Sequence, residues 1–233
     1  DYQQAPTAFL DTLRTIDQSP AHLENSLQLV EWNIDKNYLR DLQNKGVEIV
    51  PTQWHQQFDK RLLVNAFEQF STDEIIIKPT VSANADDTFR IQHDEQQTYH
   101  KKLSAIFDDR PFLIQPFMNN IVAEGEFSVF FFDETYSHTI LKTPGAEDFR
   151  VQEEHGGTLQ IVEEPANKLI QSARKLLNAL PSTPLYSRMD YVRTQQYTFA
   201  LMELELIEPS LYFNMDSESP ELFANVFDER MSE

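Results

Sequence analysis

The sequence predicts an α+β fold in which neighbouring strands pair as hairpins and helices come before or after them. Residues 186–210 read as two strands on either side of a polar turn. Residues 124–142 read as a second hairpin, and residues 74–107 read as two strands around a loop of small residues, followed by a helix. Strands that follow strands, rather than alternating regularly with helices, are typical of the α+β class.

Residues 1–51 are predicted to be the tail of an α/β domain. Apolar residues recur at helical spacing in residues 7–16, and a second helix is expected over residues 36–44. Residues 47–50 then resemble a strand, which a proline stops. The chain starts at Asp1 directly in the helical pattern, so we expect that a segment of the protein precedes it.

Residues 52–111 are predicted to form a small unit that could move as a lid. Its expected elements, in chain order, are a helix at residues 62–70, strands at Glu74–Pro79 and at residues 88–91 around the loop 80–87, and a helix at residues 94–107.

Residues 112–233 are predicted to form the largest unit. Its expected elements are a strand at 112–117, the hairpin 124–142, a helix at 166–180, the hairpin 186–210 and a tail helix at 220–228. The segment 143–158 has no clean period, yet it holds three of the five glycines. Long loops of this kind usually have a function.

The composition restricts the possible partners. A net charge of -19 argues against duplex nucleic acid and anionic membrane surfaces, whose binding requires basic side chains. The chain has no cysteine, no signal-peptide pattern and no apolar run of about 20 residues, so we expect a cytoplasmic protein. The six histidines show no zinc-ligand spacing, and there is no nucleophile-elbow or Walker sequence.

The second strand of the last hairpin carries acidic residues at alternate positions. Alternation predicts one face with Glu203 and Glu205, shared with Phe199, Leu201 and Ile207. If the hairpin closes, Arg188 and Asp190 of the first strand lie beside the two glutamates. Three carboxylates so close together would repel one another, and Mg²⁺ is the usual solution. The alternative is an amphipathic edge strand whose acids face water.

Several other polar residues are candidates for a binding site, and each also has an ordinary structural explanation. Lys78 ends an apolar strand, where its ammonium group must reach water or an anion. The remaining candidates are Lys36 on the first turn of a helix, Ser82 and Asn84 in the loop, Gln115, Phe117 and Met118 at a strand end, Glu126 at a strand start, and the cations Lys142 and Arg150.

Taken in order, these segments resemble the ATP-grasp superfamily of carboxylate-amine ligases, which includes glutathione synthetase and D-alanine-D-alanine ligase. The resemblance covers residues 29–213. It rests on DKNYLRDLQNKGVEIVPT, IIIKPTVSANAD, QPFMNN followed by EGEFS, RMD, and MELELIEPS. The pattern KTPGAEDFRVQ followed by HGG is similar to the bacterial glutathione synthetase loop. Together with ELELIEPS it resembles the cyclo-ligase of cycloserine biosynthesis.

The resemblance implies an ATP-grasp fold, in which two α+β subdomains clamp a nucleotide. It implies roles for the candidate residues: Lys36, Lys78, Ser82 and Asn84 for the ATP phosphates, Gln115, Phe117 and Met118 for adenine, Glu126 for ribose, Asp190, Glu203 and Glu205 for Mg²⁺ or Mn²⁺, and Arg150, Arg188 and Lys142 for the transferred phosphate. Two departures stand out. Glu205 stands where many members have asparagine, and the lid loop lacks glycine.

The function implied by the resemblance is a ligase that uses Mg-ATP and forms an acylphosphate from a small amino-acid-like carboxylate. An amine then displaces the phosphate. The partners would be small molecules, with a homodimer as an open option and no nucleic acid or membrane. The alternative is a nucleotide-binding module of the same fold without catalysis.

Overall fold

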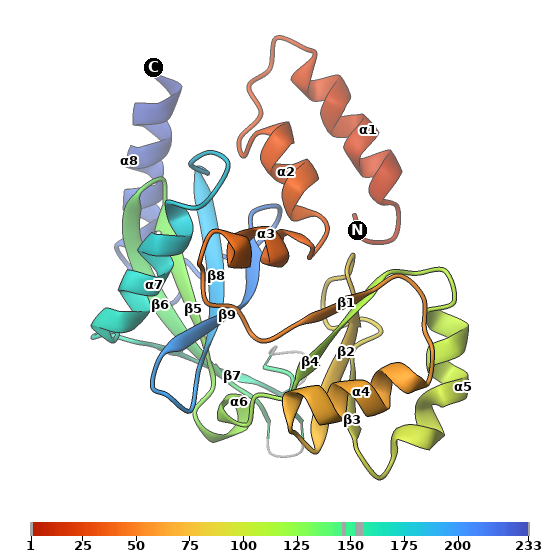
Figure 1. Ribbon diagram of the computed structural model, residues 1–233. Helices are drawn as coiled ribbons and strands as arrows, with labels where there is room; N and C mark the ends of the chain where they lie inside the picture. The colour runs from red at the N-terminus through yellow and green to blue at the C-terminus, as the bar shows by residue number, and fades with distance from the viewer. Residues whose placement is uncertain (1, 146–147, 152–155, 233) are drawn as a thin grey trace.

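The computed structural model describes residues 2–145, 148–151 and 156–232. It has the predicted α+β class, with two antiparallel sheets and helices packed against each of them (Figure 1). Within the described residues, no helix combines the length and apolar character that crossing a bilayer requires.

The smaller sheet has four strands in the order β1-β4-β2-β3. Its core lies between the sheet and two helices, which contribute Leu63, Phe67 and Leu103. The bounds are β1 Gln53–His55, α4 Arg61–Phe70, β2 Glu74–Pro79, β3 Phe89–Gln92, α5 Gln96–Ile106 and β4 Phe112–Pro116. Because β4 pairs with β1 and β2, this unit extends beyond the expected boundary at residue 111.

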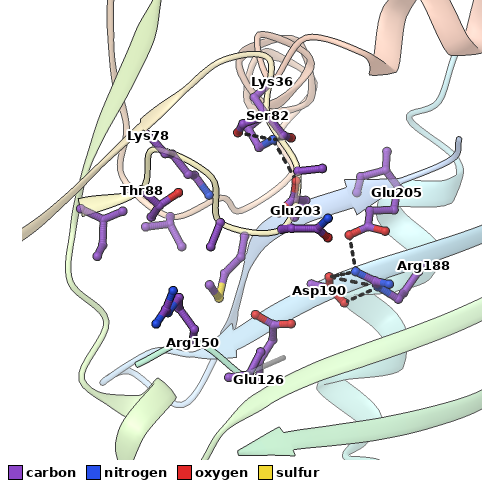
Figure 2. Close-up of a pocket in the computed structure, with 18 of the residues that line it drawn as sticks. Lys36, Lys78, Ser82, Thr88, Glu126, Arg150, Arg188, Asp190, Glu203 and Glu205 are labelled. Carbon is purple, nitrogen blue, oxygen red and sulfur yellow. Dashed lines mark hydrogen bonds and ion pairs between the residues drawn. The ribbon is translucent and has the colours of Figure 1, made fainter. Parts of the chain in front are cut away.

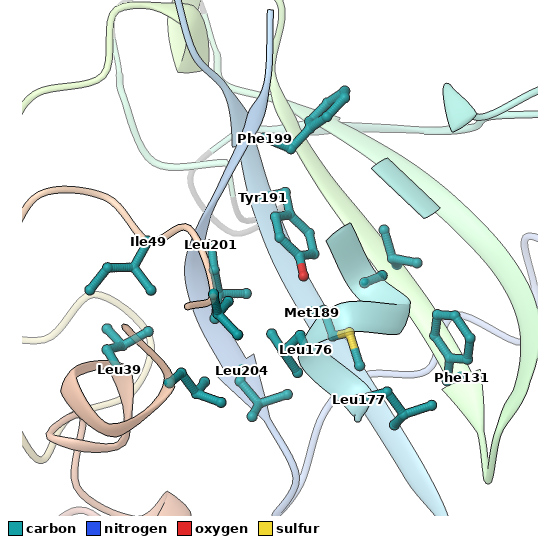
Figure 3. Close-up of a cluster of buried hydrophobic side chains, with 14 of the residues drawn as sticks. Leu39, Ile49, Phe131, Leu176, Leu177, Met189, Tyr191, Phe199, Leu201 and Leu204 are labelled. Atoms are coloured by element: carbon teal, nitrogen blue, oxygen red, sulfur yellow. The ribbon is translucent and has the colours of Figure 1, made fainter. Parts of the chain in front are cut away.

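The larger sheet has five strands in the order β7-β6-β5-β8-β9. Helices α2, α3 and α7 share its main hydrophobic core, where Leu39, Leu176 and Leu204 are almost fully buried (Figure 3). The bounds are α2 Leu27–Asn33, α3 Tyr38–Asn44, β5 Glu126–Phe132, β6 Thr135–Thr143, β7 Thr158–Ile161, α7 Asn167–Leu177, β8 Tyr186–Arg193 and β9 Phe199–Glu205.

The remaining helices lie at the periphery of this unit. Helix α8 (Ser219–Met231) covers the face of the larger sheet opposite the main core. Because successive side chains of a strand point to opposite faces, Phe131 lies in the main core and Phe132 faces α8, where its ring centroid is 5.1 Å from that of Phe223. Helix α6 (Asn120–Ala123) is a single turn after β4. Helix α1 (Pro6–Asp17) has no buried residue, and it packs against α2 at the edge of the molecule (Figure 1).

The predicted strand at residues 47–50 does not form. Ile49 makes a single parallel bridge to Leu201, with the N–H of Val50 donating to the Leu201 carbonyl at 3.0 Å. Pro51 follows at once and cannot donate a further ladder hydrogen bond, so the pairing ends after one residue. Val47 and Ile49 are nevertheless buried in the main core.

Strand β9 differs from the predicted alternation because it contains a bulge. Asp190 pairs with Glu203, but the next residue of β8, Tyr191, pairs with Leu201, so Met202 is an extra residue in the ladder. Phe199 and Leu201 therefore face the core together with Leu204 and Leu206, and they do not share the acidic face. The prediction that these two apolar residues lie beside Glu203 and Glu205 is wrong.

Candidate active site

A cavity of about 320 Å³ lies between the two sheets. It draws residues from distant parts of the chain: the start of α3, β2 and the loop after it, the end of β4, and strands β5, β6, β8 and β9. All the residues predicted for a site line this cavity, namely Lys36, Lys78, Ser82, Asn84, Gln115, Phe117, Met118, Glu126, Lys142, Arg150, Arg188, Asp190, Glu203 and Glu205.

Arg188 lies at the centre of a charged network on β8 and β9. Its guanidinium donates to both oxygens of Asp190 at 3.1–3.2 Å and forms an ion pair with Glu205 (Figure 2). The register explains this contact, since Arg188 pairs across the strands with Glu205, and Asp190 with Glu203. Burial alone would lower the pKa of Arg188, but Asp190 and Glu205 raise it above its ordinary value.

The acids of this network have displaced pKa values. Burial favours the neutral form of Asp190, but Arg188 and Lys142 outweigh burial and lower the pKa of Asp190. Glu205 has the opposite balance. Burial and the nearby charges of Asp190 and Glu203 outweigh Arg188 and raise the pKa of Glu205 to about 7.

Lys142 on β6 joins this network from the neighbouring strand. Its ammonium group lies 3.2 Å from Glu126 and 3.5 Å from Asp190. Burial, followed by the charge of Asp190, raises the pKa of Glu126. Gly125 allows the backbone before β5 to lie close to the backbone of Lys142. Its φ is +123°, and a Cβ at this position would lie 2.6 Å from the carbonyl oxygen of Lys142.

Lys36 ties the loop after β2 to strand β9. Its ammonium group donates to the carbonyl oxygen of Ser82 at 2.7 Å and to the Ser82 hydroxyl at 3.3 Å, and it lies 3.0 Å from Glu203 (Figure 2). The backbone N–H of Lys36 donates to the carbonyl of Thr80, whose hydroxyl donates to Asp35. Lys36 lies in the turn just before α3 and not on the first turn of the helix, as the sequence predicted, because α3 begins at Tyr38. This turn therefore fixes both the loop and one acid of the cavity.

Lys78 is the cation of the cavity without an internal partner: within the described residues its ammonium group makes no hydrogen bond or ion pair. Alternation along β2 buries Ile75 and Ile77 in the smaller core and turns Ile76 and Lys78 toward the cavity. Burial is the largest influence on the Lys78 ammonium group and lowers its pKa. An anion bound nearby would reverse that effect.

The loop after β2 adopts left-handed backbone conformations although it contains no glycine. Asn84, Ala85 and Asp87 have positive φ angles of 53°, 57° and 50°. In the described part of the chain, the backbone N–H groups of residues 83–85 have no acceptor, and these residues line the cavity. Arg110, which the sequence analysis missed, holds the loop by contacts with Asp87 at 2.6 Å and with the Val81 carbonyl at 3.3 Å.

The end of the cavity near β4 is mostly apolar. It is lined by Val50, Ile76, Phe117, Met118, Ile121, Phe149, Val151 and Met202. The Phe149 ring stands edge-on to Phe117 at 6.1 Å, and the Gln115 amide donates to Thr52 at 2.9 Å. The backbone N–H of Phe117 donates to the Glu74 carbonyl at 2.9 Å, so this N–H group is already engaged within the protein.

Arg150 reaches the cavity from the glycine-containing segment. Its guanidinium lies 2.7 Å from Asp148, and this contact strongly lowers the pKa of the Asp148 carboxyl group. The remainder of the predicted 143–158 motif is only partly visible, because residues 146–147 and 152–155 lie outside the described residues.

The acids fit a hard divalent cation by donor chemistry, since Asp190, Glu203 and Glu205 offer carboxylate oxygens, the ligands that Mg²⁺ prefers. They are not gathered in advance. Across residues 2–145, 148–151 and 156–232, no three acidic or histidine side chains are spaced to hold a metal ion. Instead, Arg188 forms ion pairs with Asp190 and Glu205, and Lys36 forms one with Glu203.

Comparison with known proteins identifies the architecture. The chain is 28% identical over 219 residues to the cycloserine biosynthesis protein DcsG of Streptomyces lavendulae, covering 88% of this chain and 72% of that protein. The crystal structure of the D-cycloserine synthetase DcsG superposes with a TM-score of 0.84 and 24% identity, over 98% of this chain and 80% of that chain. None of the known family models matches the sequence.

More distant structures share the same architecture. The ATP-grasp ligase PsnB, solved with a phosphomimetic precursor variant, Mg and ADP, matches with a TM-score of 0.69 and 13% identity, over 97% of this chain and 67% of that chain. D-alanine-D-alanine ligase from Bacillus anthracis matches with a TM-score of 0.66 and 14% identity, over 87% and 67%. The resemblance that the sequence motifs indicated is confirmed, and the chain adopts the ATP-grasp fold.

Proposed function

We propose that this chain is an ATP- and Mg²⁺-dependent ligase that joins a carboxylate to an amine through an acylphosphate. The observation that carries the proposal is the composition of one cavity. An apolar end suited to a purine leads to five cationic side chains and then to three acids on β8 and β9. The similarity to proteins named as ATP-grasp ligases and as a D-cycloserine synthetase supports the same reaction class.

ATP would lie along the cavity with its base against Gln115, Phe117 and Met118. Glu126 would accept hydrogen bonds from the ribose. Lys36, Lys78 and the loop containing Ser82 and Asn84 would bind the phosphates, since ammonium groups and free backbone N–H groups both favour anions. The smaller sheet would act as the lid that brings this loop down.

Asp190, Glu203 and Glu205 would hold Mg²⁺, with Mn²⁺ as an alternative hard cation. The metal would neutralise the phosphate charge and align the oxygens of the reaction. Support comes from the donor set in this chain and from PsnB, whose structure was solved in complex with Mg and ADP.

The residues of the chain would then guide two displacements. A carboxylate oxygen of the substrate attacks the γ-phosphorus, and the bond from that phosphorus to the ADP oxygen breaks. The nitrogen of an amine attacks the acyl carbon, phosphate leaves, and the amine gives up a proton. Arg150, Arg188 and Lys142 would stabilise the negative charge on the phosphoryl group in both steps. No nucleophilic side chain is needed.

The decisive experiment measures ADP release with candidate amino acids and traps the acylphosphate with hydroxylamine. We expect ADP formation that depends on the carboxylate substrate, a hydroxamate product, and loss of both in Asp190→Asn. Glu134→Gln, in the exposed β5–β6 turn, is the matched control and should behave as wild type. Binding of ATP without any substrate-dependent ADP would instead identify a non-catalytic nucleotide-binding module.

A further inference from the structure

Arg90 on β3 is a cation behind the apolar end of the cavity. Its cross-strand partner is Ile76 of β2, which lines that end. Successive side chains of a strand point to opposite faces, and the neighbouring Ile91 is buried in the smaller core, so Arg90 points to the cavity side of the sheet. Within the described residues, Arg90 is not part of the cavity lining. Any effect of Arg90 on a ligand must therefore pass through a residue that is.

The lining residue that Arg90 contacts is Phe117. The central carbon of the guanidinium group lies 3.8 Å from the centroid of the Phe117 ring, in a cation–π contact. Two hydrogen bonds to one carboxylate oxygen of Glu74, at 2.9 and 2.6 Å, hold the guanidinium group in this position. The Glu74 carbonyl accepts the backbone N–H of Phe117 at 2.9 Å. Glu74 thus fixes both the backbone of Phe117 and the cation that covers its ring.

Phe117 is also fixed from a second side. The ring of Phe149 stands edge-on to it, with the two centroids 6.1 Å apart and the ring planes at 89°. Phe117 is only 5% exposed, and it lines the apolar end of the cavity. A ligand that binds against a ring already held in one position does not lose free energy by ordering that ring. The apolar end is therefore preorganised for a flat group such as a purine.

We infer that Arg90 is a positioning residue for the purine base of the nucleotide: held by Glu74, it keeps the Phe117 ring in place as a preformed part of the cavity lining. The inference rests on the proposed function, which supplies the nucleotide. It adds a residue that does not touch the ligand and that acts on binding of the base but not on binding of the phosphates. A purely structural role, in which Arg90 and Glu74 stabilise only the smaller sheet, would leave nucleotide binding unchanged.

The test compares two probes by isothermal titration in the presence of Mg²⁺: a non-hydrolysable ATP analogue, which carries the base, and inorganic tripolyphosphate, which does not. In Arg90→Met the Kd for the analogue should rise about two- to fivefold, the factor that corresponds to a cation–π contact at a partly exposed site. The Kd for tripolyphosphate should stay unchanged, because the proposed phosphate-binding residues are intact. In the ADP-release assay the KM for ATP should rise by the same factor at constant kcat.

Three variants complete the series. Lys102→Met is the matched control, because Lys102 of α5 is an exposed cation 4.4 Å from the ring centroid of Phe89, which packs against the smaller core; it should change neither Kd. Arg90→Lys keeps the charge but not the planar group, so its Kd for the analogue should lie between those of the wild type and Arg90→Met. Glu74→Gln weakens the ion pair and should raise the Kd for the analogue alone, which decides the question if Arg90→Met does not fold.

The outcomes separate the two hypotheses. An unchanged Kd for the analogue in a folded Arg90→Met variant would overturn the assignment, and so would an equal rise for the analogue and for tripolyphosphate; the ligase function would stand in both cases. If the wild-type protein binds neither probe, the proposed function is refuted and the role of Arg90 with it.

Discussion

Replacing Lys78 by methionine should weaken nucleotide binding without destabilising the fold. Lys78 has no internal ion pair in the described residues, and burial lowers its pKa. Its charge is therefore available for a phosphate and costs free energy while no anion is bound. Methionine has a similar length and removes only the charge.

The expected rise in the Kd follows from the loss of the hydrogen bond between the Lys78 ammonium group and a phosphate. A hydrogen bond to a charged group contributes about 1.5–3 kcal/mol, which corresponds to about a 10- to 150-fold rise in the Kd for Mg-ATP. The stability of the unliganded protein should stay level or rise. Because the folded-state pKa of Lys78 lies below its ordinary value of 10.5, the cost of the charge is fully present below the folded-state pKa and is lost as the pH rises from there to 10.5. Any gain in stability should therefore shrink in alkaline buffer.

Isothermal titration with a non-hydrolysable ATP analogue and Mg²⁺ gives the Kd, and urea unfolding at pH 7 and pH 10 gives the stability. Lys101→Met, on the exposed side of α5, is the matched control and should change neither quantity. An unchanged Kd in Lys78→Met would refute the role of Lys78 in binding phosphate. A clear loss of stability would refute the conclusion that its charge is unpaired.

Three further variants test the rest of the site. Arg188→Met removes the cation of Glu205 and leaves Asp190 with Lys142 alone, so urea unfolding should show a loss of about 3–5 kcal/mol, partly restored in Arg188→Lys. Gly125→Ala should cost about 2 kcal/mol or more by the same measurement, since it adds strain at φ +123° and a 2.6 Å approach to the Lys142 carbonyl, whereas Gly156→Ala meets nothing within 4 Å and should cost less. With the folded-state pKa of Glu205 at about 7 against an ordinary 4.5, stability without ligand should fall as pH rises from 4.5 to 7, and Glu205→Gln should remove that part of the slope.

The position of the candidate site could be predicted because each of its residues lies at a recognisable point of an element. Lys78 lies at the end of an apolar strand, Lys36 lies in the turn just before α3, and Arg188 and Asp190 share one face of a hairpin strand. Local pattern is enough to place such residues on an element. Their order along the chain then indicated a known family, whose fold brings them together.

Other features of the fold and the site depend on contacts between residues far apart in the sequence, which the local sequence pattern cannot predict. The bulge at Met202 arises from pairing with β8, and it lets β9 send Leu201 and Leu204 to the core while Glu203 and Glu205 face the cavity. Strict alternation cannot produce that arrangement. Strand β7 has four residues and exists only through its pairing with β6. Likewise, no periodicity around Tyr2 could show that it lines the cavity.

The charges of the cavity explain why nucleotide and metal should bind together in a chain that is acidic overall. Most of the cavity's cations already neutralise a carboxylate: Lys36 with Glu203, Lys142 with Glu126 and Asp190, Arg188 with Asp190 and Glu205, and Arg150 with Asp148. A triphosphate can gain these cations only if they leave their carboxylates. The released acids would then repel one another across β8 and β9, and a divalent cation bound among them removes that repulsion. A bound triphosphate would therefore draw the lysines and arginines away, and the carboxylates that this exposes would suit Mg²⁺. The net charge of -19 is no obstacle, because attraction depends on this local exchange of partners.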